Sequence, residues 1–513
     1  MNKKNTLWSL ITLLVLVSML LSSCAGAPET DQETSGTSTE NNSTEASSAT
    51  EEPVEIHFAF LTFNRISEDL GSVESAIDEI TVPKINVKVK LHPYSIADYS
   101  QQINLSLQSG EGLDVFHTLG DLPQQVSQNK VTDITDTIDQ YAPEAKAIVG
   151  DNFLKASTVN GKLYGIPAYK GVAMAPNLVY RADIMEEIGV DPDTIKSVDD
   201  LSDVFAKVKE KYPDMVPLVP NMPGELGLTL TQFGIDPLSD SYFLPKAVLV
   251  GDSLQVVNYY ETEEFKKVAT LARDWYNKGY ILKDAATTTS AALELMSAGN
   301  AFSYIASYAG EQAYVQIAAQ TGHDIRMVRL GEPYLNTGSI NALTWSVAST
   351  SKNPEAALKL INLIFSDKDV INLIIYGIEG RDYVKVSDDH VQYPEGQDAN
   401  TVPYTAQLSC GIVGNQFIQY AMAGTDMADL QLMLEENQNS AVSPALGFTF
   451  DNSSVSNEES AVLNVINEYL PGLNTGSVDP EVEIPNFVAK LKAAGLDKII
   501  AAKQAQLDEW AAR

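Results

Sequence analysis

Cysteine and basic residues are both scarce in this chain of 513 residues. The two cysteines are Cys24 and Cys410, so no disulfide can form within the chain if Cys24 is modified, and the fold must then depend on its core. The 34 Lys and Arg residues stand against 68 Asp and Glu, which gives a net charge of −34 at pH 7. Such a surface repels nucleic acid and anionic lipid, so we expect no nucleic-acid partner and no electrostatic attraction to membranes.

Recognisable catalytic and metal-binding patterns are also missing. The five histidines are scattered without ligand spacing, which argues against a metal site. The segment Ser349–Lys352 has an S-x-x-K pattern, but the partner motifs S-D-N and K-T-G are absent. It leads into Asn353 and Pro354, which are typical of a helix start. We therefore expect no catalytic residue, no metal and no cofactor.

A long apolar run occurs only near the N-terminus. Residues 7–21 follow Lys3 and Lys4, which is typical of a secretory signal and too short for a stable membrane span. The run ends in Leu-Ser-Ser-Cys at Cys24, which resembles the lipobox of bacterial lipoproteins, where the Cys becomes the first mature residue and carries lipid. A plain cleaved signal with an incidental Cys is the alternative. Residues 25–53 contain no aromatic residue and no Val, Ile or Leu, and are predicted to form a disordered tether.

From Val54 onward, strand and helix periodicities alternate. Strands are predicted at 54–60, 85–91 and 113–116, with helices at 71–81 and 97–108 between them. This order implies a mainly parallel sheet whose ligand edge lies at the carboxyl ends of the strands. The loops at 62–65 and 117–121 should therefore face a ligand cleft.

A turn signal at Asn160-Gly161 marks the expected passage from one lobe to another. Asn-Gly tolerates positive φ at both central positions of a type I′ turn, so a hairpin is predicted with its second strand at 163–166. A strand at 178–180 and a helix starting near Asp183 should follow. By itself, this pattern also fits a hairpin and a helix in any α/β protein.

The rest of the chain continues the α/β pattern. Helices are predicted at 197–211, 261–278, 291–297 and 496–512, and strands at 301–305 and 343–347. Trp275 and Tyr276 lie on the second of these helices, and we interpret both as core residues rather than ligand contacts.

Three segments in order carry a family resemblance. They are NGKLYGIP with LVYRAD within 160–183, the small-residue turn and strand at 299–311, and the stretch 339–383. Together they resemble bacterial extracellular solute-binding proteins of ABC importers, family 1. Residues 447–513 further resemble a C-terminal domain of unknown function found on a subset of these lipoproteins, through the motifs FTFD, EYLP and LKAAGLD.

The resemblance implies an α/β fold with two lobes, the periplasmic-binding-protein-like fold of type II, with an interlobe hinge and a ligand cleft. The expected divisions are a signal peptide at 1–23, a lipidated Cys and tether at 24–53, lobe one at 54–167, lobe two at 168–338, a return to lobe one at 339–385, a lobe-two or cleft segment at 386–446, and the C-terminal domain at 447–513.

The same resemblance implies a function. The chain is expected to capture a carbohydrate, more specifically an oligosaccharide, and to deliver it to the transmembrane subunits of an ABC permease. It would act as a monomer without enzymatic activity, anchored through Cys24 to the outer face of the cell membrane.

A carbohydrate cleft needs aromatic rings for the CH faces of sugars and polar groups for their hydroxyls. From the loops expected at the cleft, we predict Phe63, Tyr169, Tyr308 and Tyr334 as aromatic contacts, and Asn64, Asp121, Asn177, Glu311, Glu379 and Arg381 as hydroxyl partners. Each aromatic residue is, taken alone, more often a core residue than a ligand contact.

Two alternatives stay open. A peptide or another polar solute would suit the same kind of cleft. A cell-surface glycan-cleaving enzyme is the alternative of a different class, because Asp121, Glu311 and Glu379 could converge as a catalytic carboxylate pair, although carboxylates also serve as plain hydroxyl acceptors.

Overall fold

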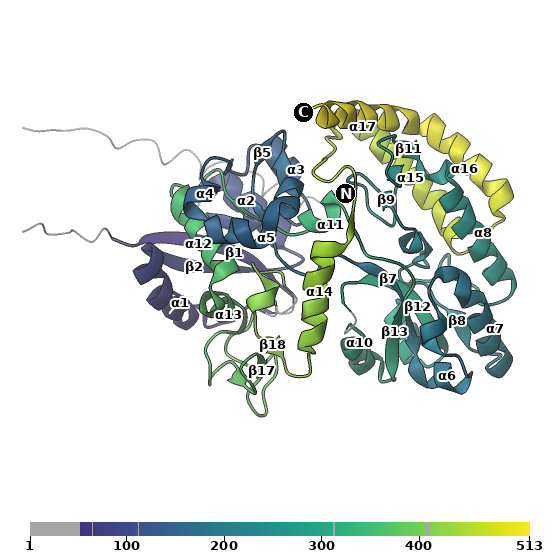
Figure 1. Cartoon of the computed structure of the whole chain (residues 1–513), viewed down its shortest axis with the longest axis horizontal. Coiled ribbons are helices and arrows are strands. Elements are labelled where there is room, and N and C mark those ends of the chain that lie inside the picture. The colour runs from purple at the N-terminus through teal and green to yellow at the C-terminus, as the bar shows by residue number, and fades with distance from the viewer. Residues whose placement is uncertain (1–51, 64, 111, 311–312, 407, 409–410) are drawn as a thin grey trace, which may run out of the picture. The chain divides into compact units, whose positions relative to one another are not determined.

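The computed structural model describes residues 52–513, apart from 64, 111, 311–312, 407 and 409–410. The predicted signal at 1–23, Cys24, Cys410 and nearly all of the predicted tether lie outside the described residues. Within the described part, two main sheets each have their own hydrophobic core (Figure 1). Of the helices in that part, none is long and apolar enough to cross a membrane.

The first sheet has five strands in the order β2-β1-β3-β15-β6. These are β1 (Val54–Thr62), β2 (Val87–Ser95), β3 (Val115–His117), β6 (Ile166–Pro167) and β15 (Thr344–Val347). β1 pairs in parallel with β2 and β3, whereas β15 runs antiparallel to β3 and β6. The parallel arrangement predicted for the first three strands is confirmed, and the later strands add antiparallel pairs.

Helices α1 (Leu70–Ile85), α2 (Tyr99–Ser109), α12 (Pro354–Ser366) and α13 (Lys368–Tyr376) accompany this sheet. The first of them is longer than predicted, because the chain stays helical through Pro83 and ends at Asn86, whose φ of 56° is left-handed. Consequently β2 begins at Val87 rather than at residue 85. As expected for a strand with one exposed face, Val87, Val89 and Leu91 are buried while the lysines between them are exposed.

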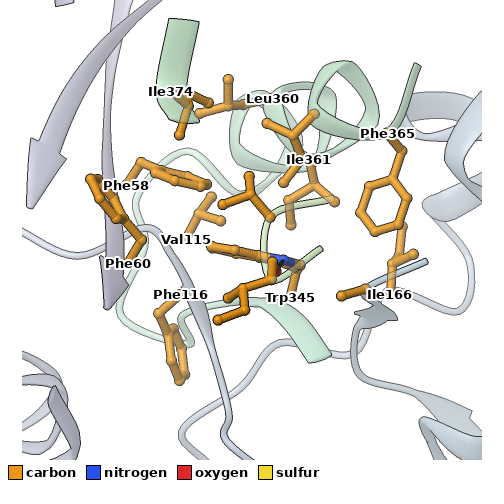
Figure 2. Close-up of a cluster of buried hydrophobic side chains, with 14 of the residues drawn as sticks. Phe58, Phe60, Val115, Phe116, Ile166, Trp345, Leu360, Ile361, Phe365 and Ile374 are labelled. Carbon is orange, nitrogen blue, oxygen red and sulfur yellow. Dashed lines mark hydrogen bonds between the residues drawn. The ribbon is translucent and has the colours of Figure 1, made fainter. Parts of the chain in front are cut away.

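Trp345 of β15 lies at the centre of the first core (Figure 2). Its ring stacks on Phe58 of β1, with centroids 4.8 Å apart and 11° between the planes. Its Nε1 donates a hydrogen bond to the carbonyl oxygen of Ile412 at 3.0 Å, which satisfies the one polar atom of the indole. Helices α12 and α13 cover these rings with Leu360, Ile361, Phe365 and Ile374, all fully buried.

The second sheet has four strands in the order β13-β7-β12-β8. These are β7 (Ala175–Arg181), β8 (Val216–Leu218), β12 (Ala301–Tyr308) and β13 (Ile325–Arg329). β7 is antiparallel to both neighbours, and β8 is parallel to β12. Because side chains alternate along a strand, Leu178 and Tyr180 join one core cluster while Val179 joins another. The sheet is therefore buried on both faces.

The hairpin predicted at Asn160-Gly161 is confirmed. β4 (Thr158–Val159) pairs antiparallel with β5 (Lys162–Leu163), and the turn residues have φ of 52° and 78°. The predicted strand at 163–166 is interrupted, however, before β6. A Cβ placed on Gly165 would lie 2.5 Å from Ser346 Oγ and 2.6 Å from the carbonyl oxygen of Trp345, so only glycine lets the chain approach β15 this closely.

Three C-terminal helices, α15 (Ser456–Asn474), α16 (Pro480–Ala494) and α17 (Leu496–Ala511), share the core of the second sheet (Figure 1). The first two pack against α8 (Glu263–Asn277), and α17 packs against α15 and α16. The helix predicted at 197–211 begins with a capping box between Ser197 and Asp200, just ahead of α7 (Leu201–Lys211). Trp275 of α8 is fully buried and donates to Ser202 Oγ at 2.8 Å, which confirms its interpretation as a core residue.

The remaining elements complete the described part of the chain. The helices are α3 (Leu122–Ser127), α4 (Ile138–Tyr141), α5 (Pro143–Ala156), α6 (Ala182–Glu187), α9 (Ala292–Ser297), α10 (Ala313–Thr321), α11 (Thr337–Asn341) and α14 (Met427–Asn439). The strands are β9 (Ile235–Asp236), β10 (Ala247–Val250), β11 (Val257–Asn258), β14 (Tyr334–Leu335), β16 (Val384–Lys385), β17 (His390–Gln392), β18 (Ala421–Met422) and β19 (Ala441–Val442). The lobe boundaries drawn from the sequence stay a prediction.

Candidate functional site

Two adjoining cavities, of about 400 and about 480 Å³, share Val172, Met174, Tyr242, Phe243 and Ser339, and we call them together the cleft. The first is also lined by Pro176, Asn221, Thr229, Leu230, Thr231, Gln232, Phe233, Ile235, Ala306, Ser307, Tyr308, Gly331, Glu332 and Tyr334. The second is also lined by Gly120, Pro123, Lys170, Asp236, Pro237, Ser239, Asp240, Ser241, Asn336, Thr337, Gly338, Asn341, Ala342 and Thr449. Each volume falls within the roughly 300–1,000 Å³ typical of small-molecule sites.

The cleft is assembled from segments far apart in the sequence. The carboxyl end of β12 contributes Tyr308, which is paired with Ala175 at the start of β7. Just before β7, Met174 forms a bridge with Tyr334 of β14. The chain that passes from the first sheet to the second therefore forms part of the cleft wall, and Gly120, from the loop after β3, completes it on the side of the first sheet.

The wall of the first cavity presents exposed apolar surface. Phe233 is 57% exposed, and its ring meets that of Tyr334 edge to face, with centroids 5.6 Å apart and 68° between the planes. Met174 is 45% exposed in the same cavity. An aromatic ring left this open has surface available for the CH face of a ligand.

Polar side chains line both cavities, and several are already oriented by the protein. Asn336 accepts from the backbone N–H of Ser339 at 2.9 Å and donates to the hydroxyl of Tyr242. Gln232 Oε1 accepts from the hydroxyl of Tyr259 at 2.8 Å. These hydrogen bonds fix amide and hydroxyl groups at the cleft before any ligand arrives.

The tyrosines of the cleft are protonated at neutral pH. Burial raises the pKa of Tyr334 to about 12 and also raises the pKa of Tyr308. The hydroxyl of Tyr308 lies 3.1 Å from that of Tyr304. Tyr308 and Tyr334 can therefore donate as well as accept a hydrogen bond, which suits a ligand rich in hydroxyl groups.

Of the residues predicted from the sequence, Tyr308 and Tyr334 line the cleft. Asp121 is exposed between Gly120 and Pro123, which line the second cavity. Asn64 and Glu311 lie outside the described residues.

The structure places the other predicted residues elsewhere. Tyr169 is 7% exposed and packs edge to face between Phe153 and Phe417 in the first core. Asn177 is buried on β7, where its Nδ2 donates to the carbonyl oxygen of Ala175 at 2.8 Å. In both cases the side chain contacts protein rather than the cavities.

The loop after α13 is held by ion pairs. Arg381 contacts Asp69 at 2.5 Å and Asp382 at 2.6 Å, and Glu379 pairs with Lys385 at 3.1 Å. Phe63 is 41% exposed, but like these two residues it is not among the side chains that line the cleft.

Sequence reasoning missed the aromatic residues at 233, 242 and 243. They lie in a stretch between α7 and α8 that has only short strands and single helical turns, so periodicity gave no signal there. A usable signal was the pair Tyr242-Phe243 between Pro237 and Pro245, because adjacent aromatic residues in a polar, proline-bounded loop are poor candidates for the core.

No group of three or more His, Cys, Asp or Glu side chains is placed to hold a metal ion in the part of the chain that the structure describes. His117, the last residue of β3, is buried, and burial lowers its pKa to about 3. Its ring stacks on Tyr99 at 4.3 Å, so it acts as a neutral packing residue.

Comparison with known families gives two matches. Residues 76–378 match the family described as bacterial extracellular solute-binding protein. Residues 444–512 match a domain of unknown function, DUF3502.

Comparison with individual proteins gives relatives over nearly the whole chain. A carbohydrate ABC transporter substrate-binding protein of Streptococcus pneumoniae serotype 4 is 25% identical over 453 residues, covering 87% of this chain and 88% of that protein. The crystal structure of an N-glycan transport solute binding protein from S. pneumoniae is 24% identical, with a TM-score of 0.75 over 89% of this chain and 98% of that one. The structure of the same protein in complex with Man1GlcNAc has a TM-score of 0.66 at 23% identity, over 90% of this chain and 100% of that one. These structural neighbours confirm the two-lobed fold expected from the sequence.

Proposed function

Because the chain belongs to the family of bacterial extracellular solute-binding proteins, we propose that it captures an oligosaccharide in the cleft and delivers it to an ABC importer. The observation that carries this proposal is the combination of open aromatic surface at Phe233 with oriented polar groups around it. Sugars offer apolar CH faces and a dense set of hydroxyls, and this wall has a counterpart for each.

The comparisons support the choice of ligand class. The pneumococcal relative is named as a carbohydrate ABC transporter substrate-binding protein, and the similar crystal structures are titled for N-glycan transport, one of them in complex with Man1GlcNAc. A mannose- and N-acetylglucosamine-containing oligosaccharide is therefore the first probe to try. The net charge of −34 argues against a polyanionic ligand.

Within this proposal, Tyr308, Tyr334, Phe233, Tyr242 and Phe243 are the aromatic and hydroxyl-bearing contacts. We also keep Asp121 as a proposed ligand contact, because it is exposed next to Gly120, which lines the second cavity. The other described candidates from the sequence are left out because their side chains are engaged elsewhere in the protein or do not line the cleft.

The proposal extends to the location of the protein. The run at 7–21 acts as a secretory signal, Cys24 carries the lipid, and the acidic segment at 25–53 tethers a monomeric binding unit outside the cell. Mass spectrometry of the membrane-extracted protein tests this: an N-terminal peptide that starts at an acylated Cys24 supports the anchor, and an unmodified Cys24 refutes it.

The binding function is tested with the purified protein and a panel of neutral oligosaccharides that includes Man5GlcNAc, with peptides as the competing class. A ligand present at 100 times its Kd should stabilise the native state by about 2.7 kcal/mol, which a thermal-shift assay detects. Chromatography of the same mixtures separates binding from hydrolysis. Binding without product supports the proposal, whereas released sugar supports the glycan-cleaving alternative, and stabilisation by peptides alone refutes the carbohydrate assignment.

A further inference from the structure

Two of the C-terminal helices, α15 and α17, contact two loops that line the cleft. We call residues 221–231 the first cleft loop and residues 236–247 the second cleft loop. The first supplies Asn221 and Thr229 to the cleft wall, and the second supplies Tyr242 and Phe243. Each loop is joined to a C-terminal helix by a buried polar contact.

Lys503 of α17 holds the second cleft loop. Its side chain is completely buried, and Nζ donates to Asp240 Oδ2 at 2.8 Å and to the carbonyl oxygens of Pro237 and Ala247 at 3.3 and 3.1 Å. An ammonium group has three donors, so all three are used within this one loop. Residue 237 lies next to the first end of the loop and residue 247 is its last residue, so a single cation from α17 joins the two ends.

The carboxylate of Asp240 extends this contact into a network. It accepts from the backbone N–H of Lys246 at 3.1 Å, and its other oxygen pairs with Lys246 Nζ at 3.0 Å. Lys246 also pairs with Glu459 of α15. Two C-terminal helices therefore contact the second cleft loop through charges that are almost fully shielded from water, where such pairs are costly to break.

The backbone of the second cleft loop has a conformation that local sequence does not favour. Leu238 and Ser239 are consecutive non-glycine residues with positive φ, of 48° and 75°. Such a conformation persists where surrounding contacts impose it. Here Ser239 Oγ accepts from the backbone N–H of Phe450, a residue that precedes α15, and Lys503 binds the carbonyl oxygen just before Leu238.

The first cleft loop contacts α15 through a separate buried hydrogen bond. Glu225 is buried, and its carboxylate accepts from the backbone N–H of Gly227 at 2.8 Å and from Asn474 Nδ2 of α15. Close by, a Cβ on Gly224 would lie 2.9 Å from Pro471 of the same helix, so loop and helix are in tight contact. These contacts of the first cleft loop share no residue with the network around Lys503.

From these contacts we propose that the C-terminal domain positions the two cleft loops, with Lys503 the positioning residue for the second loop and Asn474 that for the first. This inference rests on the proposed function insofar as it concerns ligand affinity. The part of the inference that concerns the conformational order of the two loops is independent of which ligand the cleft binds.

The test compares Lys503→Met and Asn474→Ala with the unaltered protein. Met keeps the length of the Lys side chain without its charge. Lys498→Met is the matched control, because Lys498 lies on the same helix and its ion pair with Glu458 is on the surface. Hydrogen–deuterium exchange is followed in the full chain without ligand, and affinity for Man5GlcNAc is measured by calorimetry.

We expect Lys503→Met to speed exchange about fivefold or more at residues 236–247 and not at 221–231, as the loss of one buried charged hydrogen-bond set implies. Asn474→Ala should show the reverse pattern. Both should weaken glycan binding about fivefold or more, and Lys498→Met should change neither measurement.

A general structural role would raise exchange throughout the second core, so uniform loosening, or unchanged exchange in both loops, overturns the proposal. If Lys503→Met does not fold, Asn474→Ala decides the question by the same criterion. If the unaltered protein binds none of the oligosaccharides in the panel, the proposed function fails, while the exchange pattern still decides whether the C-terminal helices order the loops.

Discussion

Replacing Phe233 with Ala is the sharpest test of the cleft. The ring is 57% exposed, and a Phe side chain has about 200 Å² to bury, so about 110 Å² faces the cavity. If a sugar ring covers half of that area, about 55 Å² is removed from water, which is worth about 1.4 kcal/mol at ~25 cal/mol per Å². The dissociation constant should therefore rise about tenfold.

Isothermal titration calorimetry with Man5GlcNAc, or with the best ligand of the thermal-shift panel, measures this change. The matched control is Phe63→Ala, because Phe63 is also an exposed phenylalanine, 41% accessible, but does not line the cleft. The control should bind as tightly as the unaltered protein. If Phe63→Ala weakens binding while Phe233→Ala does not, the ligand lies against the loop after β1, and our assignment of the cleft is refuted.

Three further predictions concern stability and pH. Burial raises the pKa of Glu225 from 4.5 to about 7, so the folded chain binds this proton more tightly than the unfolded chain does. The contribution of Glu225 to the free energy of unfolding should therefore fall by about 3 kcal/mol as the pH rises from about 4.5 to 7, and urea titrations should show a flatter pH dependence for Glu225→Gln, with equal slopes counting against this account. Gly165→Ala should lower the thermal midpoint, since the added Cβ meets the backbone of Trp345 at 2.6 Å, whereas Gly161→Ala, with no neighbouring atom within 4 Å, reports the cost of positive φ alone. Arg381→Ala should destabilise the fold by breaking the pair with the buried Asp382 and leave glycan affinity unchanged, and a loss of affinity at full stability would restore Arg381 to the site.

The sequence predicted the fold well where its patterns are local. The Asn-Gly hairpin and the helix start near Asp183 each follow from the chemistry of a few adjacent residues, and each is present. Element boundaries were less accurate, as at Asn86, where a helix runs on past a proline.

The site was predicted less well, for a physical reason. Tyr169 and Tyr308 are equivalent as sequence, since each is a tyrosine near the end of a strand. What separates them is distant: Tyr169 is enclosed by Phe153 and Phe417, whereas Tyr308 opens onto a cavity completed by the loop at 229–235. No local sequence pattern predicts which of these two tyrosine rings a segment distant in the sequence will cover.

Similarly, residues 221–247, which include Phe233 and Tyr242, have no regular periodicity from which their structure could be predicted. The two cleft loops within this stretch contact Asn474 and Lys503, more than 200 residues further along the chain. A pattern analysis of residues 221–247 alone could not have predicted these contacts.

The position of β15 in the first sheet has a consequence for how the protein is made. β3 ends at residue 117, and its neighbour β15 begins only at residue 344. The edge of β3 that pairs with β15 therefore has no partner strand until the entire second sheet has been synthesised or exported. Trp345 arrives with that strand and closes the core against Phe58. We expect the nascent N-terminal half to be prone to association through this open edge, and folding to be limited by the late, long-range closure of a sheet begun at residue 54.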